Sequence, residues 1–161
     1  MIRLAFFALL GVSSLAATDP ADEVCPWLNS ATAGGVLGGS VSSNVTRSSR
    51  GDDDATCEYT HRNGHLTYVM HIEVITMKDV HGDMQSNFTP CGGNLTRLRS
   101  IGNEAVACSV NGKGGEAEQV ISRVRDRAFV VRVSTNDSSI KPSVIREQAR
   151  NVAEQVAGNL F

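Results

Sequence analysis

The chain has few aromatic residues and no second long apolar segment. Phe, Tyr and Trp make up 5% of its 161 residues, with a single Trp. A core must therefore be built from Val, Ile, Leu, Met and Ala. After the first 16 residues, no run is long or apolar enough to cross a bilayer. Length and composition together predict one globular domain with a core of aliphatic side chains.

An excess of charge of one sign is also missing. The formal net charge is −2, from 15 Lys and Arg against 17 Asp and Glu. Nucleic-acid-binding and polybasic membrane-binding proteins concentrate positive charge, and this chain does not. We expect the partner to be an unknown protein or small ligand, with no nucleic acid and no transmembrane segment.

Recognisable catalytic and metal-binding motifs are absent from the sequence. It contains no G-x-S-x-G, H-E-x-x-H or phosphate-loop pattern, and "GKGGE" lacks the Ser or Thr that should follow the lysine. No close C-x-x-C pair suggests zinc. The prediction is therefore no catalytic residue, no cofactor, no metal and no enzyme activity. A small extracellular hydrolase with an unrecognised site stays open as the alternative.

The N-terminus has the parts of a secretory signal peptide. Arg3 is the positive region, residues 4–12 are the short apolar run, and Ser14-Leu15-Ala16 supplies small residues for cleavage. Cleavage after Ala16 would leave 145 residues (161 less 16), with 14 Lys and Arg once Arg3 is lost. We predict a signal peptide over 1–16, one domain over 17–161, and a secreted or periplasmic location.

Four cysteines follow the signal, an even number in an oxidising compartment, which favours disulfides over free thiols. We predict the pairs Cys25–Cys57 and Cys91–Cys108. Cys57 lies on the inward face of a strand that can receive the start of the first helix. Cys108 shares a strand face with Val106, and Cys91 precedes a loop that returns to it.

The segment 55–76 has the alternating pattern of a β-hairpin. Asn63-Gly64 is a two-residue turn signal, because both residues tolerate positive φ. This turn would place Tyr59 opposite Tyr68 on a buried face. His71 would lie on the wet face, diagonal to Glu58, and is expected to make a polar cross-strand contact. His61 is expected to be a half-buried packing residue.

Residues 116–135 form a second predicted hairpin, with Asp126-Arg127 as its turn and Val124 opposite Phe129. Its other face would carry apolar residues rimmed by arginine, a combination enriched at interaction surfaces. We predict that this face is exposed and binds the partner through Ile121, Arg123, Arg125, Val130 and Arg132.

Two helices complete the pattern. A short one is expected at 26–37, with proline in its first turn and glycines after its end. The last element begins at Pro142, and its apolar residues recur at helical spacing from Ile145 to Leu160. The predicted fold is α+β: an antiparallel sheet with helices packed on one face, stabilised by disulfides.

The acidic stretch Asp52-Asp53-Asp54 lies before the first hairpin, next to the tripeptide Arg50-Gly51-Asp52. The predicted register places Asp54 opposite Glu73, and like charges in that position destabilise a sheet. Either pairing ends at Ala55 or a cation bridges the two carboxylates. A solvated turn is favoured over a weak cation site and over a receptor-binding tripeptide.

The segment "CPWLNSATAGGVLGG", Cys57 beside an aromatic residue, "RLRSIGNEAVAC" and the final amphipathic helix resemble a family of small secreted or lipid-anchored bacterial domains common in actinobacteria. That family resembles in turn the extracellular sensor domain of a mycobacterial receptor kinase. The most specific part is "IGNEA", at 101–105. The resemblance implies an α+β fold and no activity. It favours a bacterial binding or sensor-like module that acts through an exposed sheet face.

Overall fold

The computed structural model describes residues 24–47, 54–79, 82, 84–88, 91, 95–112 and 115–161. The predicted signal peptide lies outside this range. The elements in chain order are α1 (Ser30–Leu37), β1 (Ser42–Arg47), β2 (Ala55–Asn63), β3 (Leu66–Thr76), the 3₁₀ helix η1 (Met84–Asn87), β4 (Thr96–Leu98), β5 (Glu104–Gly112), β6 (Gly115–Val124), β7 (Arg127–Thr135) and α2 (Pro142–Leu160).

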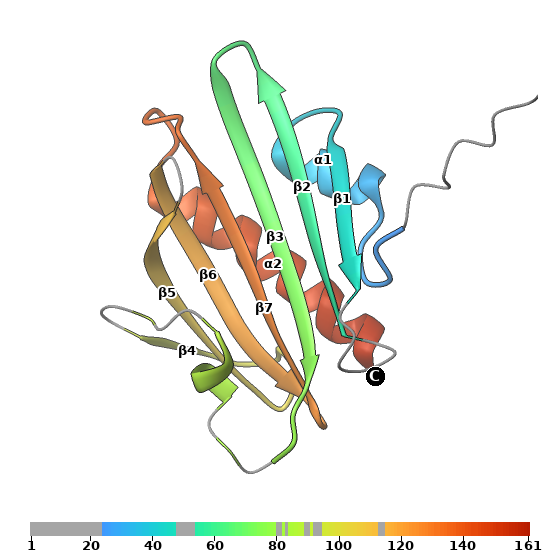
Figure 1. Cartoon of the computed structure of the whole chain (residues 1–161). Helices are drawn as coiled ribbons and strands as arrows, with labels where there is room; N and C mark the ends of the chain where they lie inside the picture. Colours follow the sequence, from blue (N-terminus) through green and yellow to red (C-terminus); the bar gives the residue numbers. More distant parts are fainter. Residues whose placement is uncertain are drawn as a thin grey trace, which may run out of the picture.

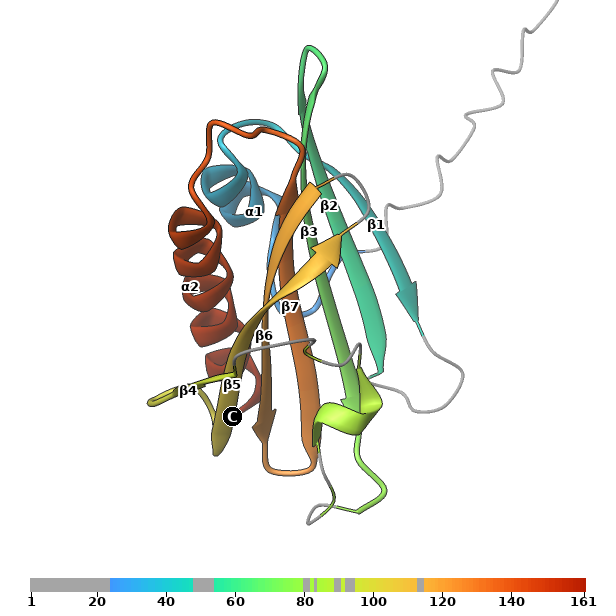
Figure 2. The same cartoon turned by 90° about the vertical axis from the view of Figure 1, so that its left-hand side faces the viewer.

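The seven strands form one antiparallel sheet in the order β1-β2-β3-β7-β6-β5-β4. Both helices lie on the same side of it, with α1 against β2 and β3 and α2 against β6 and β7 (Figure 1). The view from the side separates a helix layer from the sheet (Figure 2). The predicted α+β fold, with helices on one face of an antiparallel sheet, is confirmed. No helix among the described residues is long and apolar enough to cross a membrane.

The main core lies between the helices and the sheet and is mostly aliphatic. Alternate strand residues such as Ile72, Val120 and Val131 meet the apolar stripe of α2, in which Ile145 and Val152 are buried. The hydroxyl of Tyr59, one of the few aromatic residues here, donates a hydrogen bond to the carbonyl of Leu28. Burial of these side chains is the main source of stability for a sheet covered on one face.

The first helix begins later than its sequence predicts. Asn29 caps it by accepting a hydrogen bond from the backbone N–H of Thr32 at 2.8 Å, so the helix starts at Ser30 and Cys25-Pro26 precedes it. A capping Asn satisfies an N–H group that has no partner within the helix. The predicted end is confirmed, because Gly38 is the C-cap.

Both predicted hairpin turns are displaced by one residue. The turns are Gly64-His65 and Arg125-Asp126, so Asn63 pairs with Leu66 and Val124 with Arg127. Gly64, at φ 60°, supplies the positive dihedral angle of the first turn. A one-residue displacement of the turn shifts each cross-strand partner by two residues. Every side chain therefore keeps its predicted face, since strand side chains alternate with period two.

A smaller apolar cluster lies on the sheet face opposite the helices. Met77, Met84 and Phe88, in and around η1, pack there with Ile121 and Val130. Ile121 is 0% exposed and Val130 is 1% exposed. The prediction that these two side chains are exposed is wrong. Their face was assigned correctly, but the segment around η1 covers them.

Both predicted disulfides are present. Cys25–Cys57 joins the segment before α1 to β2, and Cys91–Cys108 joins the end of the η1 segment to β5, each with a Cα–Cα distance of 5.8 Å. The second therefore fastens the cover of the smaller cluster to the sheet. Each closed loop stabilises the fold by about 3 kcal/mol in the chain-entropy model.

Candidate functional site

We define the open face as the side chains of β1, β2, β3 and β7 that point away from the helices. η1 also lies on this side of the sheet, at one end, where it contacts β6 (Figure 2). The open face carries the following residues outside the smaller cluster: Ser42, Asn44, Thr46, Thr56, Glu58, Thr60, Arg62, Thr67, Val69, His71, Glu73, Arg132 and Ser134.

A row of four polar residues crosses β2, β3, β7 and β6 and ends at the Cys91–Cys108 disulfide on β5. Consecutive cross-strand pairs place Glu58 opposite His71, His71 opposite Arg132, Arg132 opposite Gln119, and Gln119 opposite Cys108. Directly opposite side chains are close enough to interact. We call this set the polar row. It brings together groups from strands that are far apart in the sequence.

Arg132 lies at the centre of the polar row. Its Nε and Nη2 donate hydrogen bonds to Oε1 of the buried Gln119 at 3.3 and 3.0 Å. Burial lowers the pKa of Arg132, and the nearby charge of Glu73 opposes that effect. Glu73 Oε2 also lies 3.6 Å from Nε2 of His71. Arg132 is therefore a half-buried charge held in a fixed position, where it interacts with neighbouring charges more strongly than in bulk water.

A hollow of about 860 Å³ adjoins the polar row. Its lining includes Thr56 and Glu73 from the open face, and Lys78 and Asp79 from the segment after β3. Hydroxyl, carboxylate and ammonium groups all contribute, so the wall has no charge of a single sign. Among the described residues, no group of three or more His, Cys, Asp or Glu is placed to hold a metal ion.

Asp54 also lines this hollow, and its position differs from the predicted register. Glu73 pairs with Thr56, and β2 begins at Ala55. The Asp54 carboxylate, which is 5% exposed, accepts hydrogen bonds from the backbone N–H and hydroxyl of Thr76 at 2.7 and 2.8 Å. Asp54 thus fixes the end of the β2–β3 ladder. Residues 50–53, which include the candidate receptor tripeptide and the other two aspartates, lie outside the described residues.

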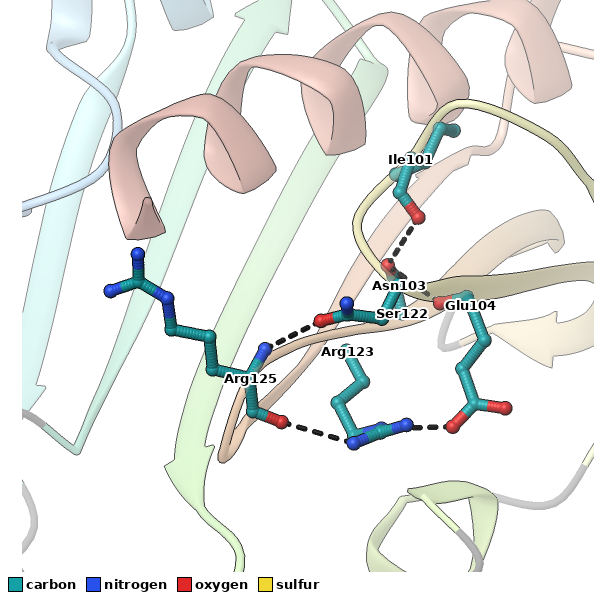
Figure 3. A network of polar contacts seen from close by, with 6 residues as sticks. All are labelled: Ile101, Asn103, Glu104, Ser122, Arg123 and Arg125. Carbon is teal, nitrogen blue, oxygen red and sulfur yellow. Dashed lines mark hydrogen bonds and ion pairs between the residues drawn. The ribbon is translucent and has the colours of Figure 1, made fainter. Parts of the chain in front are cut away.

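Two of the predicted site residues, Arg123 and Arg125, belong to a turn contact instead (Figure 3). Arg123 donates from Nε to Glu104 Oε1 at 2.9 Å and from Nη1 to the carbonyl of Arg125 at 3.1 Å. Asn103 Oδ1 accepts from the backbone N–H of Arg125 at 2.7 Å. These bonds fasten the tight β6–β7 turn to the loop before β5.

The "IGNEA" segment is the other half of this contact. Gly102 has φ 60°, and a Cβ there would lie 2.3 Å from the carbonyl oxygen of Arg123. The Ser122 hydroxyl bonds to the carbonyl oxygens of Ile101 and Glu104 at 3.1 and 2.9 Å (Figure 3). The most specific motif in the sequence therefore has a structural role. The structure brings only Arg132, of the five predicted residues, into the polar row.

The cross-strand polar row could have been found from the sequence only with both registers correct. The four polar residues of the row come from β2, β3, β7 and β6. The pairing of β3 with β7 joins strands that are far apart in the sequence, so no local pattern predicts it. The local signal was present, because Glu58 and His71 alternate with buried neighbours. The chain matches no protein-family model, no curated protein and no solved structure.

Proposed function

We propose that the mature protein is a secreted or periplasmic binding module, bacterial and sensor-like, that contacts a partner protein through the open face. The observation that carries this proposal is the polar row. It places an exposed carboxylate, Glu58, and a half-buried guanidinium, Arg132, which Gln119 holds, on a sheet face beside a large hollow. Arginine at the centre of such a surface is typical of protein–protein interfaces.

The chemistry of the partner follows from the charges. Glu58 on β2 pairs with His71 on β3, His71 pairs with Arg132 on β7, and Glu73 lies two residues along β3 from His71. A partner of mixed charge, with an acidic group for Arg132 and a basic group for Glu58, complements this pattern. Such complementarity contributes specificity and association rate more than raw affinity. The partner surface predicted from the sequence thus moves from the β6–β7 hairpin to β2, β3 and β7.

Charge reversal on the two layers of the molecule tests the proposal. Glu58→Arg alters an exposed position of the open face. Glu147→Arg makes the same change at an exposed position of α2, in the helix layer. Extracellular or periplasmic proteins of the source organism would be captured on the wild type and both variants, after circular dichroism confirms that all three fold. We expect one protein to be retained by the wild type and Glu147→Arg and lost by Glu58→Arg. Its retention by Glu58→Arg would contradict the proposal.

Export is tested separately. Mass spectrometry of the N-terminal peptide of the protein recovered outside the cytoplasm should give a chain that starts at Ala17. A chain that stays in the cytoplasm with residues 1–16 attached would contradict the signal-peptide prediction.

A further inference from the structure

A second cavity lies in the other layer of the molecule, away from the open face. It has a volume of about 210 Å³ and lies between the end of α1, the start of α2 and the ends of β2, β3 and β7. Its apolar lining includes Val36 of α1, Val133 of β7, Ile140 of the β7–α2 loop and Ile145 of α2. We call it the helix cleft. Polar residues contribute a similar share of the lining, and small-molecule sites combine apolar walls with polar groups that fix the orientation of the ligand.

His61 supplies one of the polar groups. Its Nδ1 lies 2.8 Å from the carbonyl oxygen of Ser40. A carbonyl only accepts, so Nδ1 carries a proton. The ring stacks on Tyr68, with centroids 5.7 Å apart. His61 therefore contributes an imidazole of fixed orientation to the lining of the cleft.

Tyr68 and Gln148 also donate hydrogen bonds to protein acceptors. The Tyr68 hydroxyl donates its proton to Asp137 Oδ2 at 2.7 Å, so its oxygen can accept a further bond. The Gln148 side-chain nitrogen donates to the carbonyl of Val36 at 2.8 Å, and its own carbonyl oxygen can accept. The lining also includes Asn63 and Thr135, whose side chains carry hydrogen-bond donors. The cleft therefore offers both donors and acceptors to a ligand.

The cleft wall is held in place without a ligand. Asp137 also accepts hydrogen bonds from the backbone N–H and hydroxyl of Ser139, and Asn136 accepts one from the N–H of Thr67 and donates one to the carbonyl of His65. These bonds fasten the β7–α2 loop, which carries Ile140, to the neighbouring hairpin. A wall fixed in advance avoids the entropic cost of ordering a loop on binding.

We propose that the helix cleft binds a small ligand with an apolar body and one hydroxyl end, which can donate and accept a hydrogen bond. Its volume suits one aromatic ring or a short alkyl chain, since a dry cavity of roughly 150 Å³ accommodates benzene. The hydroxyl bonds to polar side chains of the lining, among them His61 and Tyr68. This site is independent of the open face, and either can fail without the other.

Phenol and toluene are suitable probes, because they share a shape and differ in the hydroxyl. Titration of the isotope-labelled protein, followed by backbone amide NMR shifts, gives the site and the affinity of each. We expect shifts around Val36, Tyr68 and Val133. Replacing His61 or Tyr68 by Phe keeps the ring stack and removes one polar group. In at least one of these variants the phenol affinity should fall about fivefold relative to that of toluene, the usual effect of one hydrogen bond.

A blocking variant tests the location. Val36→Phe fills the cleft from α1 and should abolish the shifts of both probes, whereas Val144→Phe makes the same change at an exposed position of α2 and should leave them intact. Binding that survives Val36→Phe would overturn the location. The absence of wild-type shifts at millimolar phenol would overturn the site, and an unchanged phenol-to-toluene ratio in both ring variants would overturn the contacts of the hydroxyl with His61 and Tyr68.

Discussion

Substitution of Gly102 by alanine should destabilise the protein more than its small size suggests. At φ 60°, an L-residue pays about 1–2 kcal/mol for the left-handed conformation. The new methyl group would also lie 2.3 Å from the Arg123 carbonyl oxygen and 2.9 Å from the Ser122 hydroxyl. Since backbone contacts at 2.3 Å cannot be accommodated, the loop must move away from the β6–β7 turn.

That movement would break hydrogen bonds that hold the two turns together. The N–H of Asn103 donates to the Arg123 carbonyl at 2.7 Å, and the Asn103 side chain holds the N–H of Arg125 at the same distance. Two such bonds contribute about 2 kcal/mol together. The reduced entropy of the unfolded chain returns about 0.4–1 kcal/mol. We expect a net loss of about 3 kcal/mol.

Equilibrium urea unfolding with both disulfides intact measures this loss, with the fluorescence of the buried Trp27 as the signal. Gly35→Ala is the matched control, because a Cβ at this position of α1 meets nothing within 4 Å. It should stabilise the protein by about 0.5–1 kcal/mol through helix propensity. A Gly102→Ala variant within about 0.5 kcal/mol of the wild type would refute the reasoning, since both the strain and the lost bonds would then be absent.

Three further predictions concern other contacts. Arg146→Ala should lower the free energy of unfolding in urea by about 2 kcal/mol, because it leaves the Glu118 carboxylate, which is 2% exposed, without its ion pair. The loss is smaller than for a fully buried pair because Arg146 is half exposed. It should shrink in a Glu118→Gln background, and an equal loss in both backgrounds would contradict the pairing. Hydrogen bonds from Ser139 and, to a smaller extent, from the Tyr68 hydroxyl lower the pKa of Asp137 below its ordinary value of 3.8. The stability that Asp137 contributes is therefore present above pH 3.8 and is lost as the pH falls through its lower pKa in the folded protein. Asp137→Asn should flatten the acid limb of the stability curve, measured by thermal unfolding, and an unaltered limb would count against this role. Replacing Cys91 and Cys108 by serine should lower the free energy of unfolding by about 3 kcal/mol. Amide hydrogen exchange should become faster in the η1 segment, while α2 stays protected. Unchanged exchange in the η1 segment would show that the disulfide does not hold this segment against the sheet.

The sequence alone was sufficient for the features that follow from strand and helix periodicity, although it misplaced the start of α1 and both hairpin turns. Alternation with period two determined which side chains of β2, β3, β6 and β7 share a face, and the helical stripe from Ile145 determined the buried side of α2. The even number of cysteines and their strand faces predicted both disulfides. The signal peptide, the secreted location and the family resemblance rest on the sequence and stay predictions.

Tertiary structure decided the features that depend on pairing between distant segments. A turn displaced by one residue keeps every face and changes every neighbour, so the partner of Glu73 and the capping role of Asp54 required the folded registers. Periodicity shows that Ile121 and Val130 share a face, but it cannot show that the segment around η1 folds over them. The polar row and the helix cleft arise from the β3–β7 pairing and from the packing of α2 beside α1, contacts between residues far apart in the chain that no local pattern encodes.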